Sequence, residues 1–376
     1  MEAVIAASPA NVFYVSDYFS TGMQLGSGTQ GYALLPLDGE PALIAPLTEA
    51  DLVFESNTWI KDLFWYGCLK INSSKNPKSS EVTKSIEMAT EADSKQTPCD
   101  SLVVAVTNRG IAKKTLAIDS FGINPIRWET IKKNLPDAKI INGSKLLSEI
   151  RAVKIPEEIT RIQRATEITE KSMEDALEIA QPGIMELDMS QMYNYSVSED
   201  GGRVTYDNIG FGERSAYPNP TPTAQQLEKG ALIRLNLGAT WNHYHGNVTR
   251  TAAVGKTTAV TEKRLKAVID AQEAAFDLIK PEAKISDLYK AAQLELEKAG
   301  LKECTMNLGH CIGTECNEQP WISPSSETIL EEGMVLNVDI PYLDLGWGGI
   351  ELEDTLLVTK KDPRLLTNTE RTLYLL

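Results

Sequence analysis

The sequence lacks long apolar runs. The longest, such as GYALLPL at residues 31–37 and GALIRL at residues 230–235, fall far short of the roughly 20 residues that a membrane-spanning helix needs. The segment MEAVIAASPANVFY has no basic start followed by an apolar core, so we expect no signal peptide. Basic residues are outnumbered, 37 Lys and Arg against 52 Asp and Glu, and the net charge of −15 disfavours a nucleic-acid partner. We therefore expect a soluble, cytoplasmic protein without a membrane partner.

Cysteines are also few. An odd number, five, indicates free thiols in a reducing compartment rather than a disulfide framework. Three of them flank His310 in ECTMNLGHCIGTEC, residues 303–316. The intervening stretches of six and four residues fit no common zinc pattern, so a structural zinc site is not expected.

Residues 1–150 alternate short β-like runs with helical ones, which indicates an α/β layer domain. The predicted strands are Asn11–Val15, Tyr32–Leu37, Ala42–Ala45, Leu102–Val106 and Thr115–Ile118. The predicted helices are Thr48–Ser56, Ser80–Ala92 and Ile126–Asn134. A hydrophobic content of 42% over 376 residues suits two packed domains or one large one.

The pattern changes near residue 150, where we place a domain boundary. Pro156, Glu157 and Glu158 are typical of a first helical turn. Helices are predicted at 157–180 and 187–198, then strands at 231–239 and 247–254. Two more helices follow, one from Thr261 and one at 286–299, before strands at 304–313, 334–340 and 349–359. Two helix pairs, each followed by strands, suggest an internal duplication around a sheet.

Five sequence blocks carry a family resemblance. They are Arg151-x-x-Lys154-x-x-x-Glu158-Ile159, LNLGATWNHYHGNVTRT, LGHCIGTECNEQP, EEGMVLNVDIP and GGIELEDTLLVT. In these blocks the chain resembles the creatinase, prolidase, aminopeptidase P and methionine aminopeptidase family. The resemblance implies a mixed α/β (α+β) protein, with a "pita-bread" domain at residues 151–376 after a smaller creatinase-like domain at residues 1–150. It also implies a homodimer.

By that resemblance, the five metal-ligand positions of the family fall on Asn236, Asn247, His310, Asp339 and Glu353. The family has Asp at the first two and Glu at the fourth. Its proton-handling histidines fall on Asn219 and Asn317, and its frequent arginine two places before the last ligand falls on Glu351. The chain departs from the family at six of these eight positions, so its metal site is degenerate.

Two divalent ions side by side need bridging carboxylates to offset their repulsion. Here the family positions offer only Asp339, Glu353 and the imidazole of His310. An asparagine oxygen is an uncharged ligand that binds hard cations weakly. We therefore expect no metal pair and no other cofactor. The alternative is one weakly bound divalent ion, Mn, Co or Zn.

Without metal, the clustered acids need another partner. Glu351 and Glu353 are two residues apart on a predicted strand and share a face. Burying uncompensated carboxylates is costly, so we expect a bound organic cation beside them. His310 is the expected proton-transfer group, with Asp339 and Glu353 as the other catalytic residues. The expected substrate-binding residues are Asn219, Asn236, Asn247, Asn317 and Glu351.

Three functions follow from these observations. The first is a creatinase-like hydrolase of a C–N bond in a small amidino- or amino-acid-like substrate. The second is an Xaa-Pro aminopeptidase- or dipeptidase-like metallopeptidase with an atypical, weak metal site. The third is a non-catalytic binding protein on a peptidase fold. The expected partner is a small molecule or a short peptide, and for the third function it is a peptide or another protein.

Overall fold

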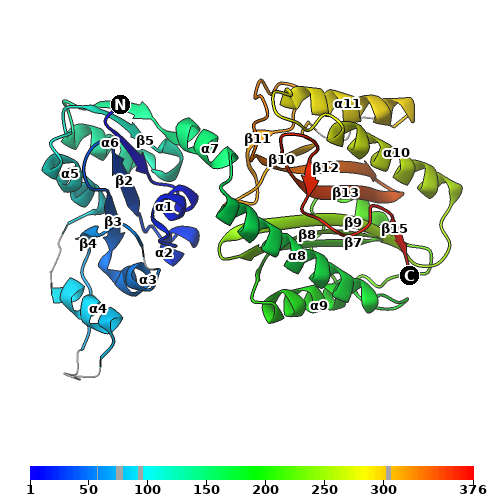
Figure 1. The fold of residues 1–376 in the computed structure, drawn as a ribbon. Coiled ribbons are helices and arrows are strands. Elements are labelled where there is room, and N and C mark those ends of the chain that lie inside the picture. The colour runs from blue at the N-terminus through cyan, green and yellow to red at the C-terminus, as the bar shows by residue number, and fades with distance from the viewer. Residues whose placement is uncertain (57, 73–78, 92–95, 302–305) are drawn as a thin grey trace. The chain divides into compact units, whose positions relative to one another are not determined.

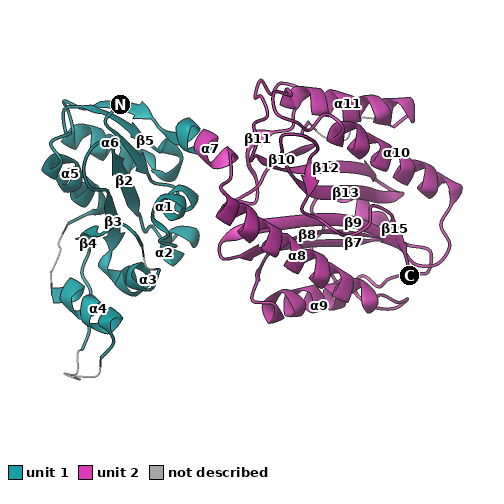
Figure 2. Cartoon of the chain, viewed as in Figure 1, with its two compact units in different colours: residues 1–148 teal, residues 149–376 magenta. Residues whose placement is uncertain are grey.

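The computed structural model describes residues 1–376 except 57, 73–78, 92–95 and 302–305. The chain divides into two compact units, residues 1–148 and residues 149–376 (Figure 2). Figure 1 shows the helices and strands of each unit. The predicted strand at 304–313 lies partly outside the described residues, and of it the structure has Gly309–Cys311 as β10.

The described residues of the first unit form a six-stranded sheet in the order β4-β3-β2-β1-β5-β6. Its strands are β1 (Ala3–Ala6), β2 (Tyr32–Pro36), β3 (Ala42–Pro46), β4 (Asp62–Tyr66), β5 (Thr115–Ile118) and β6 (Lys139–Asn142). Its helices are α1 (Pro9–Ser16), α2 (Thr21–Gln24), α3 (Ala50–Glu55), α4 (Glu81–Glu91), α5 (Pro98–Asn108) and α6 (Pro125–Asn134), with short 3-10 turns at Leu47–Glu49 and Ser120–Gly122. Strand β1 pairs antiparallel with β2 and parallel with β5, so the sheet is mixed.

Two predicted strands of this unit are wrong. Asn11–Val15 lies in α1, because Ser8 caps the helix and Pro9 occupies its first turn. Leu102–Val106 lies in α5, which begins at a capping box between Thr97 and Asp100. In both runs valines favoured a strand, with aromatic residues in the first run alone, whereas the cap just before each run starts a helix.

The second unit contains two helix pairs and a nine-stranded sheet within its described residues. The helices are α8 (Pro156–Glu178), α9 (Glu186–Glu199), α10 (Ala259–Phe276) and α11 (Ile285–Lys298). Helix α7 (Ser144–Ala152) spans the boundary between the units, and a 3-10 turn covers Gly212–Ala216. The strands are β7 (Arg203–Phe211), β8 (Leu232–Trp241), β9 (Tyr244–Ala253), β10 (Gly309–Cys311), β11 (Glu318–Trp321), β12 (Val335–Asp344), β13 (Gly348–Leu357), β14 (Arg364–Leu365) and β15 (Leu373–Leu375).

The strands run in the order β11-β10-β12-β13-β9-β8-β7, and the helix pairs pack on one face of this sheet (Figure 1). Leu235 and Leu237 of β8 join the core beneath α8 and α9. Val338 of β12 and Leu352 of β13 join the core beneath α10 and α11. Because side chains alternate along a strand, the residues between these positions lie on the opposite face, which is rich in polar side chains.

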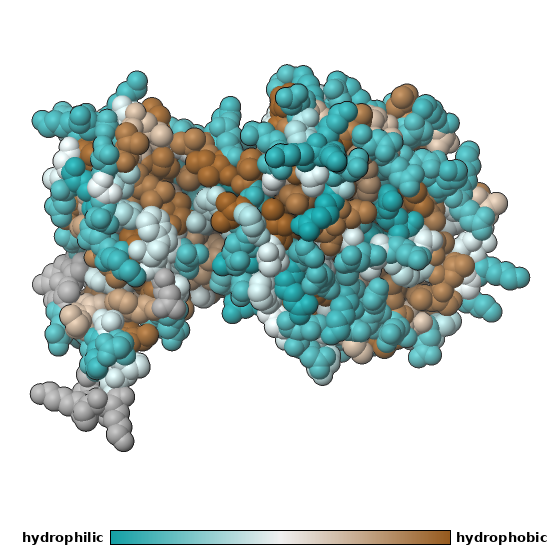
Figure 3. Space-filling model, viewed as in Figure 1, coloured by the Kyte–Doolittle hydropathy of each residue, from teal (hydrophilic) through white to brown (hydrophobic). Residues whose placement is uncertain are grey.

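Among the residues that the structure describes, no helix is both long and apolar enough to cross a membrane. Hydrophilic residues cover much of the face of residues 149–376 that Figure 3 shows, with smaller hydrophobic areas between them.

A buried ion network ties the start of the second unit to its sheet. Glu318 of β11, only 4% exposed, accepts hydrogen bonds from Arg151 Nη2 at 2.5 Å and from Lys154 Nζ at 3.0 Å. Burial alone would raise the pKa of Glu318, but Lys154 and Arg151 outweigh it and lower the pKa to about 2. Glu315 pairs with the same arginine at 2.5 Å, with its side chain 53% exposed.

Replacing Glu318 by Gln should lower the free energy of unfolding by about 3–5 kcal/mol at neutral pH, because two buried cations lose their partner. The carboxylate stabilises the fold fully above its unfolded-state pKa of about 4.3, and that contribution disappears as the pH falls toward 2. Urea unfolding at several pH values measures both effects. The difference between wild type and variant should shrink below about pH 4.

Glu315→Gln is the matched control. It removes a carboxylate from the same Arg151, but from an exposed position, so it should cost less than about 1 kcal/mol. Equal losses from the two substitutions would contradict the structural importance of Glu318.

Candidate functional site

A row of polar residues crosses the sheet on the face away from the helices. Asn236 of β8 lies opposite Asn208 of β7 on one side and Thr249 of β9 on the other. Thr249 lies opposite Glu353 of β13, which in turn lies opposite Asp339 of β12. Residues opposite one another on neighbouring strands have Cβ atoms roughly 5 Å apart. The register therefore brings three of the predicted site residues onto one line.

A second row runs beside the first. His310 of β10 lies opposite Asn337 of β12, and Asn337 lies opposite Thr355 of β13. Thr355 Oγ1 donates to Asn337 Oδ1 at 2.8 Å and to the carbonyl oxygen of Asn247 at 3.5 Å. His310 and Asn247 therefore join the same polar face from different strands.

A cavity of about 570 Å³ opens on this face. Six of the predicted site residues line it: Asn219, Asn236, His310, Asn317, Asp339 and Glu353. The other two, Asn247 and Glu351, are outside the lining, and each contacts a residue that belongs to it.

His310 presents one ring nitrogen to the carboxyl groups. Its Nδ1 lies 2.9 Å from the carbonyl oxygen of Cys311, which can only accept, so Nδ1 carries the proton. Nε2 then has a free lone pair, and it lies 3.9 Å from Glu353 Oε1. Burial lowers the pKa of His310, so the ring is neutral. The ring of Trp321 packs against it edge-on at 5.4 Å between centroids.

The carboxyl groups in the lining hold protons. Burial and the neighbouring Glu351 raise the pKa of Glu353 to about 7. Hydrogen bonds from Thr249 Oγ1 at 3.0 Å and Asn337 Nδ2 at 2.7 Å lower this pKa, but by less than the other two causes raise it. Burial, followed by the charges of Glu351 and Glu353, raises the pKa of Asp339 well above its usual value. The buried Oδ1 of Asp339 has no partner among the described residues, as expected of a carboxyl that keeps its proton.

Glu351 already has a cation, which corrects the expectation of a ligand cation at that residue. Its Oε2 forms an ion pair with Nη1 of Arg234, and both side chains are at most 5% exposed. Its Oε1 accepts from Asn236 Nδ2 at 3.3 Å. Beside Asp339 and Glu353, the lining described by the structure contains no lysine or arginine, so a ligand cation there stays a prediction.

Asn247 and Cys316 form a pair at the other end of the site. Asn247 Nδ2 lies 3.3 Å from the Cys316 sulfur, which also bonds to Tyr206. Burial raises the pKa of Cys316 to about 11, so the group is a thiol rather than a thiolate. Cys316 is therefore a packing and hydrogen-bonding group rather than a nucleophile.

A pair of divalent ions does not fit these residues. Two of the five family ligand positions hold amides whose nitrogens are engaged by Glu351 and Cys316. Within the described ranges, no group of three or more His, Cys, Asp and Glu side chains is placed to hold a metal ion. The guanidinium of Arg234 adds a positive charge beside Asn236 and Glu351.

The sequence analysis missed several residues of the site. Tyr206 and Trp321 line the cavity and Arg234 pairs with Glu351 beside it, and none of these three was singled out; Cys316, which also lines the cavity, was considered only for a zinc site. The position of Arg234 could have been predicted from the sequence, since it stands two residues before Asn236 and therefore lies on the same face of the strand. The positions of the others could not, because they depend on how β7, β10 and β11 meet.

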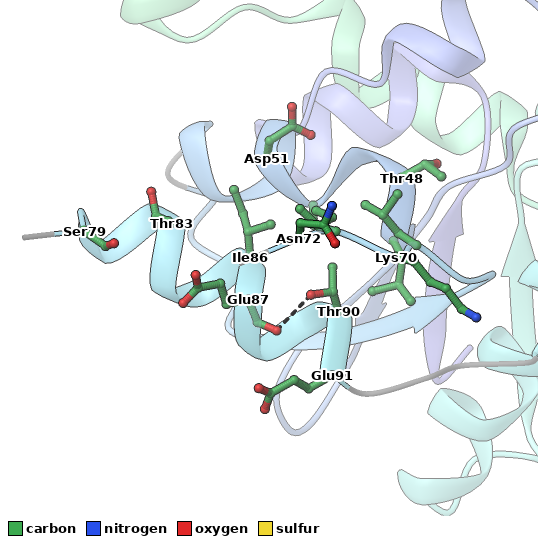
Figure 4. A pocket seen from close by; sticks show the side chains of 14 residues that line it. Thr48, Asp51, Lys70, Asn72, Ser79, Thr83, Ile86, Glu87, Thr90 and Glu91 are labelled. Atoms are coloured by element: carbon green, nitrogen blue, oxygen red, sulfur yellow. Dashed lines mark hydrogen bonds between the residues drawn. The ribbon is translucent and has the colours of Figure 1, made fainter. Parts of the chain in front are cut away.

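A second cavity, of about 910 Å³, lies in the first unit between α3, α4 and residues 69–72. Asp51, Lys70 and Glu91 point in different directions there (Figure 4). Its described lining includes no histidine or cysteine. The cavity of the second unit, where an imidazole and two carboxyl groups converge, is therefore the candidate site.

Two family models match the chain. The model of metallopeptidase family M24 matches residues 160–360, and that of the creatinase/prolidase N-terminal domain matches residues 1–153. These matches confirm the resemblance, the predicted fold class and the prediction of a hydrolase of this family.

Relatives and solved structures agree with the models. The chain is 33% identical over 249 residues to an Xaa-Pro dipeptidase of Pyrococcus furiosus, covering 64% of this chain and 70% of the relative. A Pyrococcus horikoshii Xaa-Pro dipeptidase is 31% identical, covering 64% and 69%. The prolidase structure from Pyrococcus furiosus has a TM-score of 0.79 at 26% identity, covering 98% of this chain and 97% of that one. An X-Pro aminopeptidase structure from Thermotoga maritima has a TM-score of 0.81 at 21% identity, covering 100% and 98%, and shows the fold alone.

The state of Cys316 is testable by alkylation. With a pKa of about 11, Cys316 should react with iodoacetamide at neutral pH at least about 10-fold more slowly than the exposed Cys68 of the same chain. Peptide mass spectrometry at successive times measures both rates. In urea the two cysteines should react alike, and equal rates in the folded protein would contradict the assignment of a buried thiol.

Proposed function

This chain belongs to metallopeptidase family M24, and from that premise we propose that it hydrolyses short peptides at the bond before a proline. Two Pyrococcus relatives carry the name Xaa-Pro dipeptidase, which favours this activity over the creatinase-like C–N hydrolysis that the sequence analysis put first. A cavity of about 570 Å³ has room for a dipeptide.

One observation carries the proposal. The unprotonated Nε2 of His310 lies 3.9 Å from Oε1 of Glu353, a carboxyl group whose pKa of about 7 leaves it partly protonated at neutral pH. A base and an acid thus stand side by side in the wall of one cavity, with Asp339 opposite Glu353. Aspartic proteases show that carboxyl groups sharing a proton can hydrolyse peptides without metal.

In the proposed reaction, Nε2 of His310 takes a proton from a water molecule as the water oxygen bonds to the scissile carbonyl carbon. The carbonyl oxygen becomes an oxyanion, to which the side-chain amides of Asn219 and Asn317 donate. Glu353 gives its proton to the proline nitrogen, the C–N bond breaks, and a carboxylic acid and free proline leave. The histidinium then returns its proton to Glu353.

No step of this reaction uses a metal ion, because the residues present do not fit a pair. One weakly held divalent ion (Mn, Co or Zn) beside His310, Asp339 and Glu353 stays an alternative for the cofactor. Activity after removal of metal, compared with activity after adding these ions back, separates the two cases.

A second candidate is peptide binding without hydrolysis. The observation that favours it is the engagement of two amides by the protein itself, Asn236 by Glu351 and Asn247 by Cys316. Amides fixed in this way shape a pocket but transfer no protons. Binding of a dipeptide without release of proline would support this candidate.

We also propose a cytoplasmic homodimer, which the family resemblance supports. Light scattering of the purified full-length chain measures the assembly.

The hydrolysis is tested with the full-length chain after treatment with a chelator. Wild type should release proline from Ala-Pro, and His310→Ala should reduce kcat by about 100-fold or more, because a general base contributes roughly that factor. The measurement is proline release over time, with elemental analysis of the same samples.

His243→Ala is the control, since His243 lies in the turn between β8 and β9 and does not line the cavity. It should leave kcat within about twofold of wild type. An unchanged rate in His310→Ala would remove His310 from the mechanism. Activity that returns only with Mn, Co or Zn would replace the metal-free reaction with the single-ion alternative.

A further inference from the structure

Arg234 is a buried cation beside the candidate site with four hydrogen bonds. Its guanidinium is 1% exposed. Its Nε donates to the carbonyl oxygen of Ser215 at 2.6 Å, and its Nη2 donates to those of Tyr217 and, at 3.2 Å, Pro218. Nη1 completes the set through the ion pair with Glu351. One guanidinium therefore joins the segment just before Asn219 to strand β13.

The contacts continue from Glu351 into the cavity wall. Its other oxygen accepts from Asn236 at 3.3 Å, and a hydrogen bond links its carboxyl group to that of Asp339. Asn236 and Asp339 both line the cavity. Asn219, Asn236 and Asp339, which belong to three different segments, thus share one positively charged anchor.

The family resemblance implies an arginine at a different position. The family's frequent arginine falls on position 351, which is glutamate here, and the guanidinium comes instead from strand β8, two residues before the first family ligand position. The guanidinium lies beside Asn236 and forms an ion pair with Glu351. The carboxylate of Glu351 is therefore not free to bind a metal ion.

We propose that Arg234 is a built-in replacement for a metal ion: its guanidinium supplies the positive charge that holds the acidic cluster together and, by doing so, excludes divalent cations from the cavity. Two effects act together. Like charges a few ångströms apart repel, and the repulsion is stronger where the protein excludes water. In addition, a guanidinium that already uses four hydrogen bonds does not move aside for a competing ion. Arg234 is a positioning residue here, not a catalytic one.

The inference goes beyond the proposed function and does not depend on it, because its readout is metal affinity rather than hydrolysis. The full-length chain, freed of metal by chelation and dialysed, is titrated with Mn²⁺ by calorimetry. Wild type should bind Mn²⁺ weakly. Arg234→Met, which keeps the length of the side chain and removes its charge, should bind at least about 10-fold more tightly, the change expected for about 1.4 kcal/mol.

Two further variants make the test decisive. Arg234→Met with Glu351→Gln removes both charges, so no buried carboxylate is left unpaired, and it should bind Mn²⁺ with an affinity between those of wild type and the single variant. If the single variant fails to fold, the double variant still tests the inference. Arg264→Met is the matched control, because Arg264 pairs with Asp344 at 2.9 Å and does not line the cavity. It should bind like wild type.

Three results would overturn the inference. Tight Mn²⁺ binding by wild type would show that the guanidinium excludes nothing. An affinity in both Arg234 variants no higher than in wild type would remove Arg234 as the cause. An equal gain in Arg264→Met would reduce the effect to overall charge. Hydrolysis of Ala-Pro by wild type, present or absent, changes none of these readings.

Discussion

The arrangement of the candidate site depends on the buried ion pair between Arg234 and Glu351. Both side chains are almost completely buried, so each needs the other to balance its charge. The pair is stabilised by the carbonyl oxygens of residues 215, 217 and 218, which take the remaining guanidinium donors. Breaking it would leave a buried charge and would release the segment that carries Asn219.

Charge balance explains the rest of the site. Three carboxyl groups gather on neighbouring strands, and each is neutralised in its own way. Arg234 compensates Glu351, whereas Asp339 keeps a proton and Glu353 titrates near neutral pH. An acidic cluster in a protein interior is balanced by metal ions, by protons or by a guanidinium, and among the described residues Arg234 provides the guanidinium for Glu351. The side chains of Asn219, Asn236 and Asn317 add neutral donors and acceptors to the cavity lining, and Asn247 contacts the lining residue Cys316.

The strand pattern of the second unit could be predicted from the sequence. Apolar residues alternate with Arg234 and Asn236 in one strand and with Glu351 and Glu353 in another, so each strand places its own pair on one face. In the first unit the same reasoning failed at Asn11–Val15 and Leu102–Val106, where helix caps outweighed the preference of β-branched residues for strands. Local hydrogen bonds at a helix start are specific, whereas β propensity reflects packing that a sequence does not display.

The family and the fold were predicted correctly from the sequence, because both follow from residue types and their spacing. Six of the eight predicted site residues line one cavity in the structure. Only the tertiary structure decided what balances the remaining acids. Arg234 and Glu351 are 117 positions apart, and they meet because β8, β9 and β13 are neighbours in the sheet. A Coulomb interaction depends on distance in space and on the exclusion of water, and neither is written in the order of the residues.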